Sequence, residues 1–169
     1  MKFLLPVLIL AIALIACCTG TIPTTLICPD GTQVLGSLGA CPATSFCKGT
    51  ARCYYATVTK IIDGDTIEVN HNTSIRLALV DAPEYNEIGG AEATEFVSNI
   101  CQKDSTVLVD EDDGQTAGSY GRIVAVVYCK GNRWNINAEL LTNGKATLYE
   151  EFCNVSEFAN ESWVKHYGC

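Results

Sequence analysis

Positive charge is scarce in this chain. Its 169 residues include 11 Lys and Arg against 19 Asp and Glu, a formal net charge of −8 at pH 7. Proteins that bind nucleic acid usually neutralise phosphates with Lys and Arg. The composition therefore excludes a broad electrostatic attraction to nucleic acid, and any phosphate chemistry must depend on a few local residues.

The N-terminal apolar run is shorter than a membrane span. The run from Phe3 to Ile15 cannot cross a hydrocarbon core of ~30 Å as a helix, and with Lys2 before it residues 1–16 are typical of an export signal. It ends in Leu-Ile-Ala-Cys, which resembles a lipobox and implies cleavage before Cys17 and lipid attachment there. We expect an exported lipoprotein on the outer face of a membrane; an ordinary secretory signal is the alternative. Loss of residues 1–16 removes one Lys and no acid, so the net charge changes from −8 to −9.

Metal-binding patterns of the zinc type are missing. No Cys-x-x-Cys occurs, and the two histidines, His71 and His166, are too far apart to suggest a pair. Ten cysteines behind an export signal indicate disulfides instead, although a zinc site built from the first cysteines of residues 28–53 stays open. With Cys17 lipidated, we expect Cys18 to be unpaired. Spacing alone does not fix connectivity; our predicted pairs are Cys28–Cys41, Cys47–Cys53, Cys101–Cys129 and Cys153–Cys169.

The chain divides into segments of different composition. Residues 17–27 are expected to form a flexible tether. Residues 28–53 have too few apolar side chains for a core, so if ordered they form a disulfide-stapled mini-module or a cap on the next domain. Residues 54–169 form the main domain, and the acidic run Asp110 to Asp113 is expected to be a solvated hairpin.

The main domain has the pattern of strands joined by tight turns. Asp63-Gly64 predicts a hairpin, Ala93 to Ile100 has the apolar spacing of an amphipathic helix, and a short helix around Leu140 is stopped by Gly144. A last helix is expected from Asn154, with Glu157 completing a capping box. The predicted strands are Val58–Ile62, Thr66–Val69, Ile75–Val80, Ser105–Val109 and Arg122–Tyr128. We predict an α+β fold, a small five-stranded OB-fold barrel with about three helices.

Five charged side chains in this domain form a candidate site. Asp65 and Asp81 each lie at the edge of a predicted strand, where carboxylate oxygens can converge on a hard divalent cation. Glu84 follows a proline and can take a proton from water. Arg76 and Arg122 can each form two parallel hydrogen bonds to a phosphate. Together these residues are what a metal-assisted phosphodiester hydrolase needs.

These motifs resemble the staphylococcal nuclease family. The matching pieces are DGDT at 63–66, RLALVDAPE at 76–84, GAEATEF at 90–96, SYGR at 119–122, and Asn137 followed by Gly144. The likeness covers roughly Ala56 to Gly144. It implies calcium as cofactor, held by Asp65, Asp81 and the main-chain carbonyl of Ala82. It also implies Glu84 as general base or water orienter, and Arg76 and Arg122 as phosphate clamps.

The chain departs from the family pattern where substrate is held. Gly118 and Ser119 replace an acid and a lysine, and the loop from Glu84 to Gly90 is shorter and lacks lysines. Glu150 and Phe152 stand where the family has two tyrosines, and Glu150 is expected to repel a phosphate. We predict that Tyr120, Tyr149 and Phe152 contact the substrate.

These observations predict an exported calcium-dependent nuclease, a monomer acting on DNA, RNA or both. A non-catalytic OB-fold lipoprotein that binds nucleic acid or protein is the alternative, because a fold alone does not fix function. A purely structural lipoprotein would leave the five charged residues unexplained. Calcium binding through Asp65 and Asp81 discriminates between the enzyme and a scaffold.

Overall fold

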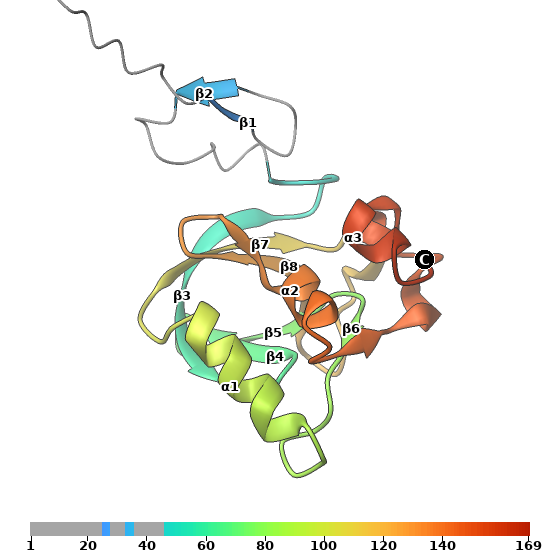
Figure 1. Ribbon diagram of the computed structural model, residues 1–169. Helices are drawn as coiled ribbons and strands as arrows, with labels where there is room; N and C mark the ends of the chain where they lie inside the picture. The colour runs from blue at the N-terminus through green and yellow to red at the C-terminus, as the bar shows by residue number, and fades with distance from the viewer. Residues whose placement is uncertain (1–24, 28–32, 36–45) are drawn as a thin grey trace, which may run out of the picture.

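The computed structural model describes residues 25–27, 33–35 and 46–169 (Figure 1). The predicted signal, Cys17, Cys18 and the predicted pair Cys28–Cys41 lie outside the described residues. Within the described part, none of the helices combines the length and apolar character needed to cross a membrane.

A closed barrel forms the centre of the domain. Its strands are β3 (Cys53–Ile61), β4 (Thr66–Val69), β5 (Thr73–Leu77), β7 (Thr106–Glu111) and β8 (Ile123–Cys129). They pair in the order β5-β4-β3-β7-β8, and a parallel pairing of β5 with β8 closes the sheet on itself. This confirms the predicted five-stranded α+β barrel. β9 (Trp134–Asn135) adds a short edge to β8.

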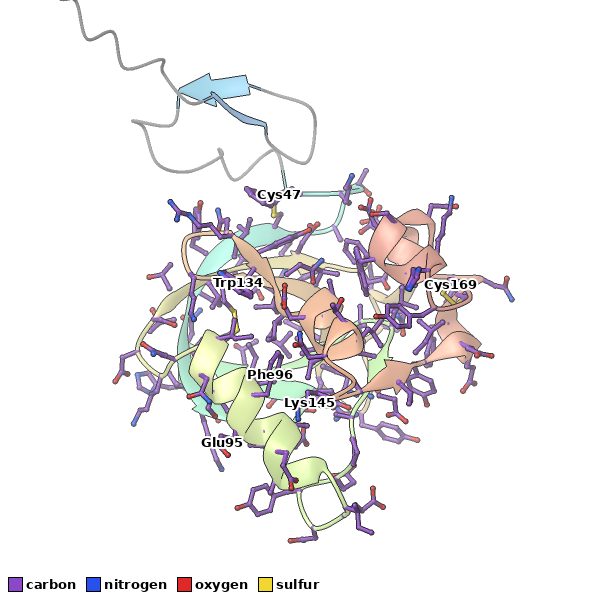
Figure 2. All side chains as sticks on the ribbon, in the orientation of Figure 1. Cys47, Glu95, Phe96, Trp134, Lys145 and Cys169 are labelled. Carbon is purple, nitrogen blue, oxygen red and sulfur yellow. A yellow bond between two sulfur atoms is a disulfide. The ribbon has the colours of Figure 1, made fainter. Side chains whose placement is uncertain are left out.

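The barrel interior is filled by aliphatic side chains. Ile67, Ile75 and Val127 are fully buried in one cluster, and α1 (Gly90–Ile100) contributes Val97 to it. α1 contacts β3 and α2 (Ile136–Thr142), and Figure 2 shows Phe96 on its barrel side and Glu95 on its outer side. Alternating apolar positions on strands and helical spacing on α1 therefore point into the same core.

β8 is buried on both faces, which explains its unbroken apolar run. Ala125 and Val127 face the barrel core, whereas Val124 and Val126 belong to a second cluster with Phe158. That second cluster is covered by the C-terminal segment, which comprises η4 (Glu150–Phe152), η5 (Glu157–Asn160) and α3 (Ser162–Lys165). Burial on both faces favours continuous rather than alternating hydrophobic sequence.

The C-terminal segment is not the single helix that was predicted. The 3₁₀ turn η5 is capped by Ser156, whose hydroxyl accepts from the Phe158 N–H, and Glu161 is extended, so α3 begins as a separate element. Asn154 is an exposed residue before this turn, and the cap of η5 is Ser156 instead. The predicted capping box is therefore wrong, and the Glu157 side chain accepts from the Asp113 N–H instead.

The predicted strand Ile75–Val80 is also interrupted. β5 ends at Leu77, Ala78 and Leu79 form a turn, and β6 (Val80–Asp81) then pairs with β10 (Thr147–Leu148). Leu79 has φ +61°, a left-handed conformation that is unfavourable for a branched side chain. Contacts to the carbonyls of this corner hold the turn, as described below.

Three predicted disulfides are present, Cys47–Cys53, Cys101–Cys129 and Cys153–Cys169. Cys101 and Cys129 join the end of α1 to the end of β8 and are both fully buried. Cys153–Cys169 closes the C-terminal segment, and Cys47 lies where the chain enters the domain (Figure 2). β1 (Thr25–Ile27) and β2 (Gln33–Leu35) form a separate antiparallel pair.

The acidic run Asp110 to Asp113, which begins in the last two residues of β7, is not a solvated hairpin. Asp110 and Asp112 are completely buried. Asp110 accepts from the Lys48 N–H at 2.8 Å, and Asp112 caps η3 (Asp113–Gln115) by accepting from the Gly114 N–H. The prediction failed because both carboxylates accept from backbone N–H groups distant in sequence, that of Lys48 for Asp110 and that of Glu157 for Asp112, and composition does not reveal such partners.

Candidate functional site

A pocket of about 400 Å³ brings the candidate residues together. It lies where β4, the β5–β6 corner, the loop before β8 and the C-terminal segment meet. All five predicted charged residues line it, namely Asp65, Arg76, Asp81, Glu84 and Arg122, and so do the three predicted substrate contacts, Tyr120, Tyr149 and Phe152.

Arg76 joins the two aspartates. Its Nη2 lies 3.1 Å from Asp65 Oδ2 and 3.0 Å from Asp81 Oδ1. The two carboxylates therefore approach the same nitrogen from different segments: Asp65 immediately precedes β4, and Asp81 lies on β6. Asp65 and Arg76 are 6% and 8% exposed, whereas the Asp81 side chain is 57% exposed. The Arg76–Asp65 pair is thus fixed in the protein, and Asp81 forms the solvent-facing side.

Asp65 is held on both of its oxygens. The Ala82 N–H donates to Oδ2 at 2.7 Å and the Thr66 hydroxyl donates to Oδ1 at 3.1 Å. Burial raises the pKa of Asp65 to about 6, although the Arg76 guanidinium and the Ala82 N–H favour the ionised form. The carboxylate is therefore costly to keep charged, and its neighbours supply the stabilisation.

The β5–β6 corner wraps around the Arg76 guanidinium. Nη1 donates to the carbonyls of Leu77 at 3.1 Å and of Val80 at 2.6 Å. From the other side, the buried Asn137 amide donates to the Ala78 carbonyl at 2.9 Å and accepts from the Val127 N–H. These bonds satisfy the backbone of the turn that breaks the strand, so the turn and the arginine position one another.

Arg122 also reaches the pocket. Nη1 lies 3.2 Å from the Thr66 hydroxyl, and Nε donates to the Ser119 carbonyl at 3.2 Å. Ser119 and Arg122 also exchange both main-chain hydrogen bonds, each at 2.9 Å. The tight SYGR turn therefore presents the guanidinium at the start of β8, and Thr66 connects it to Asp65.

Glu84 is exposed at the mouth of the pocket. It follows Pro83 in the loop between β6 and α1, and its carbonyl accepts from the Glu87 N–H at 2.8 Å. Gly90 packs against the Glu84 backbone so closely that a side chain there would collide with it. The loop backbone is thereby fixed while the Glu84 carboxylate stays accessible to solvent.

The outer side of the pocket is aromatic. The rings of Tyr149 and Phe152 meet edge to face at 4.8 Å between centroids, and the Arg76 guanidinium lies 5.8 Å from the Tyr149 centroid. Tyr120 is fully exposed and has φ +51°. Flat rings that remain accessible in this way can stack on a base.

Three polar residues of the pocket were not among the predicted site residues. Gln115, Ser119 and Glu151 also line the pocket. Ser119 could have been found from its place in the SYGR motif. Glu151, rather than Glu150, faces the pocket, because the 3₁₀ turn η4 sets the direction of each side chain and that turn was not predicted. Gln115 carries no sequence signal.

The donor chemistry fits calcium. Asp65 and Asp81 offer hard carboxylate oxygens that already converge on one cationic nitrogen. In the described residues, the single group of three potential ligand side chains with ligand atoms within 4.8 Å is Cys47, Cys53 and Asp110, whose cysteines form a disulfide. An ion between Asp65 and Asp81 would therefore need main-chain or solvent oxygens as further ligands, which is consistent with the predicted Ala82 carbonyl.

The protein is thus an α+β protein with a closed OB-type barrel, and one pocket beside this barrel contains both carboxylates and guanidiniums. The chain belongs to the staphylococcal nuclease family: the family model described as "Staphylococcal nuclease homologue" matches residues 74–165, more than half of the chain. The resemblance predicted from the motifs is thus confirmed. The match includes Arg76, Asp81, Glu84 and Arg122.

Individual relatives extend this likeness. An uncharacterized protein of Methanocaldococcus jannaschii is 30% identical over 145 residues, 66% of this chain and 70% of that protein. An uncharacterized endonuclease of Haemophilus influenzae is 31% identical over 99 residues, and a micrococcal nuclease of Shigella flexneri is 30% identical over 105. Each of these two alignments covers 56% of this chain, and the matched part spans only 52% and 58% of those proteins.

Proposed function

We propose that this protein is a calcium-dependent nuclease that hydrolyses phosphodiester bonds of DNA, RNA or both. The observation that carries the proposal is the single pocket lined by Asp65, Arg76, Asp81, Glu84 and Arg122. Membership of a family whose relatives include proteins named endonuclease and micrococcal nuclease supports it.

The two arginines have different tasks in this proposal. Arg76 already donates to two carbonyls and two carboxylates. It can therefore contact a phosphate if a phosphate oxygen replaces the exposed Asp81 carboxylate as a hydrogen-bond acceptor. Arg122 donates to Ser119 and Thr66 and is only partly buried, so it is the more available guanidinium. Two planar forks on opposite sides of one phosphate would stabilise the charge that develops on its oxygens.

Glu84 is the proposed general base or water orienter. An exposed carboxylate on a fixed loop can take the proton of an attacking water once a phosphodiester lies between the arginines. Calcium, held by Asp65, Asp81 and the Ala82 carbonyl, would act as a Lewis acid toward a phosphate oxygen. Tyr120, Tyr149 and Phe152 would hold the neighbouring nucleotide by stacking.

Cleavage assays with calcium and with chelator test this proposal. The full chain, expressed where disulfides form, is expected to cut DNA, RNA or both with calcium and to lose the activity with chelator. Asp81→Asn should raise the calcium concentration needed for half-maximal rate, because it removes one negative ligand. Cleavage that is equally fast in chelator would refute the calcium assignment, and no cleavage by folded protein at any salt or pH would refute the enzyme.

A non-catalytic binding module is the second candidate. Four carboxylates line the pocket, Asp65, Asp81, Glu84 and Glu151, against the two guanidiniums of Arg76 and Arg122. The acidic surroundings weaken attraction to a polyanion. Binding of single-stranded oligonucleotide or a protein without turnover would favour this candidate.

We also propose export and lipid attachment at Cys17, on the strength of the N-terminal pattern. Three disulfides within the described residues support an oxidising compartment. Metabolic labelling with a radioactive fatty acid should mark the wild type and not Cys17→Ala. Equal labelling of both, or of neither, would contradict a lipid anchor at this residue.

A further inference from the structure

A short segment before the barrel holds the acidic loop after β7. Residues 46–52, here called the strap, are tied by the disulfide Cys47–Cys53 to the start of β3 (Figure 1, cyan). The strap precedes residues 74–165, which match the family model. Its contacts therefore belong to this chain and are not implied by that match.

Asp113 receives the strap with both carboxylate oxygens. The Thr50 N–H lies 3.0 Å from Oδ1 and 2.8 Å from Oδ2, the Thr50 hydroxyl donates to Oδ2 at 3.0 Å, and the Ala51 N–H donates to Oδ1. These hydrogen bonds, that from the Thr50 N–H first, lower the pKa of Asp113. A carboxylate that accepts several backbone donors in this way serves as a fixed anchor.

The strap packs closely against Asp113 at Gly49. Gly49 has φ +54°, and a Cβ at this position would collide with the carboxylates of both Asp113 and Glu157. Glu157 accepts in turn from the Asp113 N–H at 3.2 Å. The strap backbone, the loop and the C-terminal segment therefore meet at Asp113 with no room for a side chain between them.

Hydrogen bonds within the loop, together with its chain connections, lead from Asp113 to the pocket. The neighbouring Asp112 accepts from the Gln115 side chain at 2.9 Å, and Gln115 lines the pocket. The Gln115 carbonyl accepts from the Gly118 N–H at 2.8 Å, and the next residue, Ser119, is paired with Arg122. One end of this loop is thus fixed by the strap and the other by β8.

We propose that Asp113 is a positioning residue, through which the strap holds the 112–122 loop so that Arg122 and Gln115 face the substrate. The expected effect on turnover rests on the proposed function. The structural coupling of the strap to the loop is independent of it. Since a misplacement of about 1 Å can cost 10²-fold in rate, loosening the loop should lower kcat more than it raises KM.

The test is Asp113→Asn in the full chain. The asparagine side chain has nearly the same shape as the aspartate. One of its two terminal groups is an amide N–H₂, which would face the N–H or hydroxyl donors of Thr50 and Ala51 and cannot accept from them. Amide hydrogen exchange followed by mass spectrometry should show faster exchange in residues 114–122 with β3 and β7 still protected. We expect kcat to fall about tenfold or more with KM changed less than about threefold.

The matched control is Asp104→Asn. Asp104 is exposed in the turn before β7 and has φ +65°, a conformation that asparagine accepts readily. It should leave both exchange and turnover unchanged. If Asp113→Asn fails to fold, Thr50→Ala removes one hydrogen bond of the set and should produce a smaller change of the same kind.

The outcomes separate the two proposals. If the wild type cleaves nothing, the proposed function fails, while faster exchange in 114–122 would still support the coupling of strap and loop. Unchanged exchange in Asp113→Asn would overturn the inference. Faster loop exchange with unchanged kcat would overturn the positioning role, as would equal loss of kcat in Asp104→Asn.

Discussion

The inner and outer ends of the pocket are built differently. At the inner end, Asp65 and Arg76 are 6% and 8% exposed; Asp65 immediately precedes the barrel strand β4, and Arg76 lies on the barrel strand β5. At the outer end, Tyr120 and Tyr149 are 100% and 36% exposed and lie on segments outside the barrel strands. Groups that must be placed accurately are therefore on rigid elements, whereas groups that adjust to a substrate are on the periphery.

The largest expected effect comes from removing the inner guanidinium. Arg76→Leu leaves Asp65 buried without its cation and the Val80 carbonyl without its donor. We expect the free energy of unfolding to fall by about 3–5 kcal/mol, as when one partner of a buried ion pair is removed. Urea unfolding measures this.

The matched variant for this experiment is Arg76→Leu combined with Asp65→Asn. It removes the uncompensated charge and should recover part of the lost stability. A loss below about 1 kcal/mol in Arg76→Leu would mean that the inner end is not fixed as described, since breaking a buried pair normally costs several times more.

Arg122→Lys tests the other guanidinium without removing charge. Lysine lacks the planar fork, so it cannot donate to both Thr66 and a phosphate in the same geometry. We expect kcat to fall about 10²- to 10³-fold, the usual effect of losing one transition-state donor, with unchanged thermal unfolding. Arg133→Lys is the control, because Arg133 is an exposed arginine that does not line the pocket. Equal kcat values in the two variants would contradict the role of Arg122.

Asp110 can be compared with Asp65 at the inner end of the pocket. Both carboxylates are buried, but Asp65 is paired with the Arg76 guanidinium, whereas Asp110 accepts from the Lys48 N–H. Burial raises the pKa of Asp110 to about 7, and its Oδ1 has no hydrogen-bond partner in the described part of the chain. The folded pKa lies above the unfolded value, so the stability that Asp110 contributes is fully present below its unfolded pKa and is lost as pH rises through about 7.

The corresponding measurement is urea unfolding of wild type and Asp110→Asn between pH 4 and pH 8. Relative to the variant, the wild type should lose up to about 4 kcal/mol across this range, since the pKa is raised from 3.8 to about 7 and one pKa unit corresponds to about 1.4 kcal/mol. Parallel pH curves for the two proteins would show that Asp110 is ionised as easily in the folded state as in the unfolded chain.

The smallest effect is expected at the outer end. Tyr149→Ala removes a ring that can stack on a base, and we expect KM to rise about three- to tenfold with kcat within about twofold, because stacking contributes about 1–3 kcal/mol per base. Tyr167→Ala is the matched control, since Tyr167 is 37% exposed and does not line the pocket. A large loss of kcat in Tyr149→Ala would mean that the outer end takes part in the chemistry.

The five barrel strands and the inner end of the site could be predicted from the sequence. Alternating apolar residues and the Asp63-Gly64 turn place Asp65 at a strand edge, and the motifs place Arg76, Asp81 and Arg122. These features are local, so a short window of sequence contains them.

The features that were missed depend on contacts between distant segments. The break at Ala78 and Leu79 needs Asn137 from α2, and burial of Asp112 needs the Glu157 backbone N–H, which donates to it. The division of the C-terminal helix follows from packing Phe158 against β8. Tertiary contacts of this kind override local propensity.

The most direct test of the central claim is the single-turnover rate of DNA and RNA cleavage, at saturating calcium, by wild type, Glu84→Gln and Glu87→Gln. Both changes are isosteric, and the two residues are exposed neighbours on one loop, but only Glu84 lines the pocket of the five charged residues. We predict a loss of about 10²- to 10⁴-fold for Glu84→Gln, the contribution of a general base, and a near-wild-type rate for Glu87→Gln. A wild-type rate in Glu84→Gln would contradict the account.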